Sequence, residues 1–209
     1  KYYANILNPF SAQLRKKLQE IAALGLPIDI IATSHGVSWR DDPMQIVEQY
    51  ARWADDYQEN QATVVYDTMW NGTKALAESV AAGLSAADPE MTVKVFNIAK
   101  SDVNDIITEV FKSKAVLVGS PTMSNSMLPS VAGFIHLMKS LRFKNKKAAA
   151  FGCYGWSGEA VKLMNVSLAD AGLEVVTDGY RHLWNSDEDA QHAAYEFGRS
   201  ILGQQEMEE

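Results

Sequence analysis

Cysteine is almost absent from this sequence, and the one cysteine, Cys153, narrows the possible functions. A single thiol cannot form a disulfide framework or bind an iron–sulfur cluster through the chain's own cysteines. A chain without internal disulfides suits a reducing compartment, so we expect a cytoplasmic location.

Long apolar runs and an excess of basic residues are also missing. No apolar run reaches the ~18 residues that a membrane-spanning helix needs, so we expect no membrane partner. The 19 Lys and Arg residues are outnumbered by 26 Asp and Glu residues, which gives a net charge of −7. This acidic balance also argues against nucleic acid and anionic lipid as partners.

From residue 62 onward, short apolar runs alternate with amphipathic runs. Residues 62–66, 92–98, 115–119, 147–152 and 173–177 are expected to form strands. Residues 73–85, 103–111, 129–141, 158–170 and 187–202 are expected to form helices, with Ser101 and Asp187 as N-caps. This alternation predicts an α/β fold with a doubly wound, five-stranded parallel sheet, and such sheets bind ligands at the carboxyl ends of their strands.

Residues 1–60 do not follow this alternation. Asn8-Pro9 predicts a helix that runs to about Leu24, residues 28–32 resemble a strand, and Asp42-Pro43 precedes a second helix. One strand and two helices cannot close a core alone. We therefore expect this segment to need a partner, and we place the boundary between the two parts at residues 57–61.

The first strand runs into the loop "DTMWNGT", which has the chemistry of a phosphate site. Thr68 and Thr73 offer hydroxyls, Asn71 offers an amide and Gly72 allows close approach, while a helix start directs backbone N–H groups at an anion. A triphosphate-binding loop needs Lys ahead of the hydroxyl, and a dinucleotide-binding loop needs G-x-G-x-x-G. Neither is present, so the loop suits one terminal phosphate monoester; the alternative is a capped helix start without a ligand.

Two further loops follow the third and fourth strands. They supply Pro121, Thr122, Met123, Ser124 and Asn125, and then Cys153, Tyr154, Gly155, Trp156, Ser157 and Gly158. Together with Met69 and Trp70 of the first loop, they provide aromatic side chains that can stack on a flat ring or pack loop against loop. A phosphate at one end and a flat heteroaromatic ring at the other describe flavin mononucleotide (FMN).

These loops resemble a known family. "YDTMWNGT", "VGSPTMSNSMLPSVAG" and "AFGCYGWSGEA" resemble the flavodoxin module of the flavodiiron proteins (A-type flavoproteins). "YYANILNPF" and "TSHGVSWR" resemble the end of that family's metallo-β-lactamase-like domain. The resemblance implies a flavodoxin-like domain over residues 61–209, preceded by the C-terminal segment of a di-iron domain over residues 1–60.

The resemblance also implies roles for individual residues. Thr68 to Thr73 would bind the FMN phosphate, whereas Pro121 to Asn125 and Cys153 to Gly158 would line the ribityl chain and the ring. His35 matches the family's last histidine ligand of iron. The other iron ligands of the family lie upstream of this match, so we expect the chain to be the C-terminal part of a longer protein.

Family members reduce dioxygen or nitric oxide with electrons from rubredoxin or a similar carrier, and pair head to tail as homodimers. The resemblance therefore implies an oxidoreductase in which FMN passes electrons to a non-haem di-iron site, and it leaves the choice of gas open. Alternatives are a free-standing flavodoxin-like electron carrier and an FMN-dependent quinone reductase. Residues 1–60 distinguish these alternatives, because neither needs the segment "TSHGVSWR".

Overall fold

The computed structural model describes residues 1–203, so the last six residues of the expected second domain lie outside it. The strands are β1 (Ile31–Ala32), β2 (Ser38–Trp39), β3 (Gln61–Tyr66), β4 (Thr92–Asn97), β5 (Ala115–Gly119), β6 (Lys147–Tyr154), β7 (Glu174–Val175) and β8 (Tyr180–Leu183). The helices are α1 (Ser11–Ala23), α2 (Met44–Trp53), α3 (Gly72–Ala87), α4 (Val103–Lys112), α5 (Pro129–Leu141), α6 (Glu159–Asp170) and α7 (Glu188–Ser200). Short helical turns are η1 (Tyr3–Leu7), η2 (Asn8–Phe10) and η3 (Ile98–Lys100).

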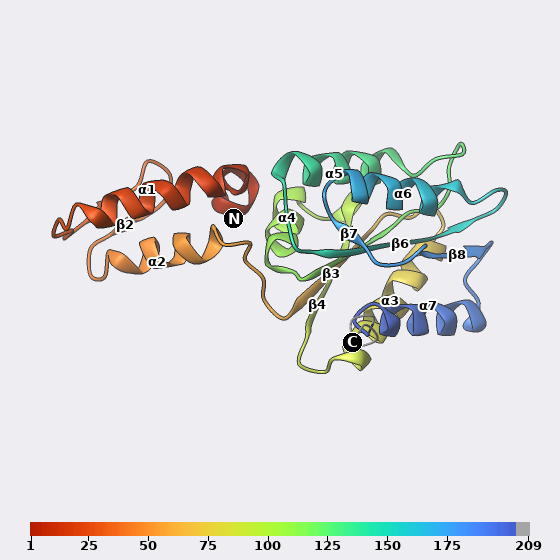
Figure 1. Ribbon diagram of the computed structural model, residues 1–209. Helices are drawn as coiled ribbons and strands as arrows, with labels where there is room; N and C mark the ends of the chain where they lie inside the picture. Colours follow the sequence, from red (N-terminus) through yellow and green to blue (C-terminus); the bar gives the residue numbers. More distant parts are fainter. Residues whose placement is uncertain (204–209) are drawn as a thin grey trace, which may run out of the picture.

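The main sheet is parallel, with the strand order β4-β3-β5-β6-β7 and with β8 also paired to β6. Helices α4, α5 and α6 cover one face, and α3 and α7 cover the other (Figure 1). The central strands β3 and β5 are buried along their whole length, as expected for strands covered on both sides. The doubly wound, flavodoxin-like fold that the sequence predicts is confirmed.

The predicted residue range of the fifth strand, 173–177, is wrong. This strand forms as two short strands, because β7 pairs with the start of β6 and β8 pairs with its end. Between them Gly179 has a φ of 91°, and a Cβ there would lie 2.6 Å from the carbonyl oxygen of Ala150. The glycine lets the chain pass close beside β6, and β8 then reaches the carboxyl edge of the sheet.

Helix ends follow the sequence with one correction. Asp187 caps α7 by accepting a hydrogen bond from the backbone N–H of Ala190, as expected. The cap of α4 is Asp102 rather than Ser101, because the Asp102 carboxylate accepts from the N–H groups of Asn104 and Asp105. These N–H bonds stabilise the carboxylate and hold the pKa of Asp102 below its ordinary value.

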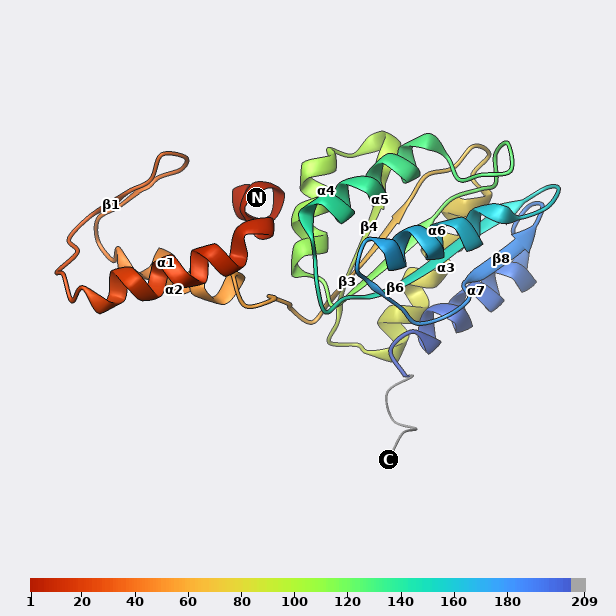
Figure 2. The ribbon, with the colours of Figure 1, turned by 45° about the horizontal axis from the view of Figure 1, so that its top comes forward.

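The N-terminal helices α1 and α2 extend away from the main sheet (Figure 2). The expected strand over residues 28–32 is only β1, and the "TSHGVSWR" segment, expected as a loop, includes its antiparallel partner β2. Neither helix fully buries a residue, and the apolar side chains of Ile21 in α1 and of Leu24, which follows α1, are exposed. The expectation that this part has no core of its own is therefore confirmed.

Tyr3 joins the N-terminal part to the main sheet. Its buried ring lies 5.3 Å from the ring of Trp53 in α2 and 5.5 Å from Phe111 in α4, measured between centroids.

Within residues 1–203, no helix has the length and apolar character that crossing a membrane requires.

Candidate functional site

A cavity of about 190 Å³ lies at the carboxyl edge of the sheet, where the sequence predicts the cofactor. It is bounded by the loops that follow β3, β5, β6 and β8. Its lining residues are Thr68, Met69, Trp70, Gly72, Pro121, Thr122, Cys153, Tyr154, Gly155, Trp184 and Asn185. None of these described lining residues is a lysine or arginine, so the cavity contains no fixed positive side chain.

The loop after β3 is held by Asp67. Its carboxylate accepts hydrogen bonds from the backbone N–H of Thr68 at 2.8 Å and from the hydroxyl of Ser130 at 2.5 Å. The Thr68 hydroxyl oxygen is buried and has no hydrogen-bond partner among the described residues. A buried polar atom without a partner is costly, so its presence indicates a ligand atom at this position.

Helix α3 begins beside this hydroxyl. Asn71 precedes it in the left-handed conformation, with a φ of 65°, and Gly72 is its first residue. The first N–H groups of a helix lack intrahelical acceptors and carry partial positive charge, so an α3 start beside the cavity suits a phosphate. The arrangement supplies donors without a cation, as the loop chemistry predicts.

Thr73 is placed differently from Thr68. Its side chain is fully buried, and its hydroxyl lies 3.2 Å from the sulfur of Cys153. A Cβ on Gly72 would lie 3.0 Å from the same sulfur, so a small residue is needed there. Thr73 and Cys153 therefore pack the loop after β3 against the end of β6.

Aromatic side chains form the walls of the cavity. Trp70 is 84% exposed and Trp184 is 69% exposed, although both line the cavity. Tyr154 completes the wall, and the guanidinium carbon of Arg181 lies 5.8 Å from its ring centroid. Exposed tryptophans beside a cavity provide flat apolar surface for a ring.

Several residues predicted from the sequence lie outside the cavity lining. Met123 and Ser126 exchange backbone hydrogen bonds across a tight turn, in which Ser124 and Asn125 have positive φ values. Trp156 is 93% exposed, and the Ser157 hydroxyl donates to Glu159. Gly158 has a φ of 73° and lies against the Tyr154 ring. The structure thus brings together the first loop and the starts of the other two loops.

The sequence did not predict Trp184 and Asn185 as site residues. Trp184 has a φ of 65°, its N–H donates to the Tyr154 carbonyl at 2.7 Å, and its ring lies against Gly155. The sequence "YRHL" has no apolar/polar alternation that could have revealed them. The alternating burial of β8, which ends at the same edge as β6, is visible only in the structure.

His35 lies far from this cavity in the sequence, at the turn of the β1–β2 hairpin. It is exposed, and its ring centroid lies 5.0 Å from that of Tyr2. Within residues 1–203, no three His, Cys, Asp or Glu side chains are grouped so that they could hold a metal ion. His35 alone therefore does not form a metal site in the described part of the chain.

A doubly wound sheet with a neutral helix start and aromatic walls at its carboxyl edge defines a flavodoxin-like module. The family model described as "Flavodoxin" matches residues 64–198. The chain therefore belongs to the flavodoxin family. This family binds FMN, and the unpartnered Thr68 hydroxyl, the cation-free α3 start and the tryptophan walls fit that cofactor.

Longer relatives match the chain over nearly its whole length. The "Anaerobic nitric oxide reductase flavorubredoxin" of Escherichia coli O1:K1 / APEC is 52% identical over 204 residues, which are 98% of this chain and 42% of that protein. The flavodiiron protein from Giardia intestinalis is 34% identical, with a TM-score of 0.89 over 96% of this chain and 49% of that one.

The rubredoxin oxygen:oxidoreductase from Desulfovibrio gigas is 30% identical, with a TM-score of 0.91 over 97% of this chain and 50% of that one. These matches confirm the resemblance to flavodiiron proteins. The chain spans about half the length, or less, of these relatives.

Proposed function

We propose that this chain is the FMN-carrying part of a flavodiiron oxidoreductase that reduces nitric oxide or dioxygen. The cation-free cavity with an unpartnered Thr68 hydroxyl and tryptophan walls carries this proposal. The 52% identity to a flavorubredoxin and the likeness to a rubredoxin oxygen:oxidoreductase support the reductase activity and a rubredoxin-type donor.

The chain's own residues bind and orient the cofactor. The Thr68 hydroxyl and the N–H groups at the start of α3 donate to the phosphate, and Asp67 keeps the loop in place. Trp70, Tyr154 and Trp184 exclude water from the ring. Because no lysine or arginine lines the cavity, negative charge on a reduced flavin ring would have no ionic partner there. FMN, when bound, supplies electron transfer in single steps between the donor and the reductase site.

The proposal also assigns a separate role to each of the two parts of the chain. Residues 61–209 form the FMN domain, and residues 1–60 complete a metallo-β-lactamase-like domain to which His35 contributes an iron ligand. The exposed apolar side chains of Ile21 in α1 and of Leu24 and Leu26 just after it support this, because they need a covering partner. Head-to-tail pairing into a homodimer would bring a flavin and a di-iron site from different subunits together. The single free Cys153 supports a cytoplasmic location.

Replacement of His35 tests the proposal. The experiment uses a protein that contains both this chain and the region that supplies the other iron ligands. His35→Ala is expected to lower the iron content and the consumption of nitric oxide and dioxygen, because an imidazole suits iron. FMN content is expected to stay unchanged, since the cavity lies on other loops. Metal analysis, flavin absorbance and gas electrodes provide the measurements.

His136→Ala is the matched control, because His136 is an exposed histidine on α5. It should leave iron, FMN and gas consumption unchanged. Full iron and activity in His35→Ala would contradict the ligand role. A wild-type protein that accepts electrons from the donor but consumes neither gas would instead be an electron carrier.

A further inference from the structure

A second cavity, of about 340 Å³, lies at the amino edge of the sheet, opposite the cofactor cavity. We call this cavity the amino-edge pocket. It is lined by Gln58, Lys114, Asn145, Lys147, Glu174 and Leu202. They come from the linker before β3, the starts of β5, β6 and β7, and the turn that follows α7. Its volume lies in the range of about 300–1,000 Å³ that is typical of small-molecule sites.

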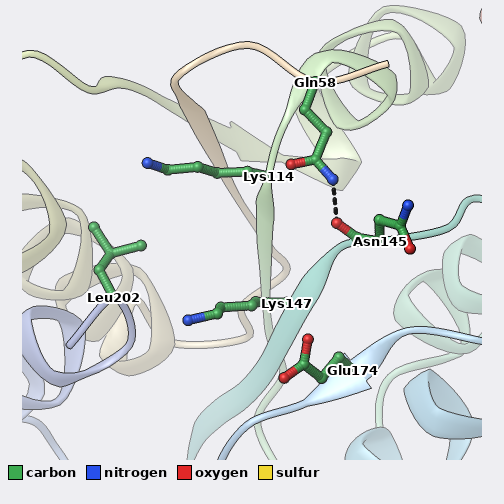
Figure 3. Close-up of a pocket in the computed structure, with 6 residues that line it drawn as sticks. All are labelled: Gln58, Lys114, Asn145, Lys147, Glu174 and Leu202. Atoms are coloured by element: carbon green, nitrogen blue, oxygen red, sulfur yellow. Dashed lines mark hydrogen bonds between the residues drawn. The ribbon is translucent and has the colours of Figure 1, made fainter. Parts of the chain in front are cut away.

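Two half-buried lysines define the chemistry of this pocket. Lys114 immediately precedes β5, and Lys147 begins the neighbouring strand β6, where it pairs in register with Ala115. Figure 3 shows both side chains extended in the same direction, towards the side on which Leu202 lies. Like charges held together in a partly buried place repel each other, and an anion between them relieves this repulsion.

One carboxylate outside the lining pairs with one of the two lysines. Lys114 forms an ion pair with Asp88, 3.7 Å between Nζ and Oδ2, and the same carboxylate also accepts hydrogen bonds from Asn60 and Glu90. Lys147 lies opposite Glu174 in the β6–β7 register, yet within residues 1–203 no carboxylate comes within 4.0 Å of its ammonium group.

The neighbouring lysine, Lys146, is engaged elsewhere. Successive side chains of a strand point to opposite faces, and the Lys146 ammonium donates to the carbonyls of Phe111 and Ser113 at 2.9 and 2.6 Å. The local positive charge of the amino-edge pocket therefore comes from Lys114 and Lys147, in a chain whose net charge is −7.

The rest of the lining is uncharged except for Glu174. Gln58 donates a hydrogen bond to the carbonyl of Asn145, and these amides form the wall across from Leu202 (Figure 3). Leu202 offers apolar surface in the same pocket as the two lysines. Two lysines act as separate point charges, an arrangement that suits phosphate rather than a planar carboxylate, and the remaining volume can hold an uncharged group.

We propose that the amino-edge pocket binds a small phosphorylated molecule, with its phosphate between Lys114 and Lys147 and its organic part against Leu202. This phosphate site is separate from the flavin site, because the two cavities lie at opposite edges of the same sheet. Free polyphosphate and a nucleotide share the required chemistry.

Calorimetric titration of the FMN-loaded protein with inorganic pyrophosphate and with ADP tests this proposal. We expect saturable binding of one molecule per chain. Lys114→Gln and Lys147→Gln should each weaken binding by about tenfold or more, because each removes one of two ionic contacts. Glu174→Gln should strengthen it, because this change removes a nearby negative charge.

Lys94→Gln is the matched control, since Lys94 is an exposed strand lysine outside the pocket, and it should leave the affinity unchanged. ADP should bind more tightly than pyrophosphate if Leu202 contacts the organic part; equal affinities would overturn that assignment. Absence of saturable binding, or equal weakening in all the lysine variants, would overturn the site itself. Binding seen only in FMN-free protein would also overturn it, because the phosphate would then occupy the flavin loop.

Discussion

Thr68 and Thr73 stand in the same loop, but their hydroxyls have different surroundings. The Thr68 hydroxyl is buried without a partner, whereas the Thr73 hydroxyl faces the Cys153 sulfur at 3.2 Å. We expect Thr68→Ala to weaken FMN binding by roughly 1.5–3 kcal/mol, the range for a hydrogen bond to a charged group. Fluorescence titration of the FMN-free protein measures this change.

Thr73→Ala provides the comparison for Thr68. We expect a smaller loss of affinity, because its contact with Cys153 positions the loop and leaves the Thr68 hydroxyl in place. A wild-type dissociation constant in Thr68→Ala, with a large loss in Thr73→Ala, would move the phosphate contact to Thr73, the other hydroxyl of the predicted loop.

Trp156 and Trp184 are alternative candidates for contact with the flavin ring. The sequence places Trp156 among the predicted ring contacts, but that side chain is 93% exposed and does not line the cavity, whereas Trp184 does. We expect Trp184→Ala to weaken FMN binding and shift the flavin's reduction potentials, since stacking contributes ~0.5–1.5 kcal/mol beyond area. Spectroelectrochemical titration measures the potentials.

Trp156→Ala serves as the paired variant. It should change the potentials less than Trp184→Ala, and neither variant should lower the thermal unfolding temperature much, because both side chains are exposed. A larger shift of potential in Trp156→Ala would restore that residue to the ring contact predicted from the sequence.

At the level of elements, the alternation of strands and helices was predictable because the core strands are continuous apolar runs. The fifth strand was not, because its second half, β8, has half-exposed residues and follows a break at Gly179. Missing β8 also meant missing Trp184 and Asn185, which follow it into the cavity. The hydroxyls and aromatic residues of the first loop were predictable, since their chemistry is local to the loop.

Lys146 joins two elements, the end of α4 and the start of β6. Burial lowers its pKa from 10.5 to about 7, while its ammonium donates to the carbonyls of Phe111 and Ser113. Between pH 7 and 10.5 the unfolded chain therefore binds more protons than the folded chain. The free energy of unfolding should rise with pH across this window, with a Lys146 contribution of up to ~1.4 kcal/mol per pH unit.

Lys146→Met is expected to flatten this rise, because the variant has no group to titrate at that position. Urea unfolding at pH values from 7 to 9.5 measures the slope. Lys144→Met, which changes an exposed lysine two residues earlier, should keep the wild-type slope. Equal slopes in wild type and Lys146→Met would contradict a depressed pKa for Lys146.

At the scale of the whole molecule, a closed α/β layer structure carries an open N-terminal part. The aromatic contacts of Tyr3 with Trp53 and Phe111 join the two parts. The helical spacing of Ile46, Val47, Tyr50 and Trp53 predicts the half-buried face of α2. The sequence did not reveal that Tyr3 packs into the core beneath α4. Such long-range contacts depend on tertiary packing, which local periodicity does not encode.

The identity of the cofactor tests the central claim most directly. The cavity has one helix start for phosphate, tryptophan walls for a ring and no lining cation among the described residues. Cofactor released by heat from the purified protein should therefore run as FMN on chromatography, close to one per chain. An adenine-containing flavin or a nicotinamide dinucleotide would contradict the account.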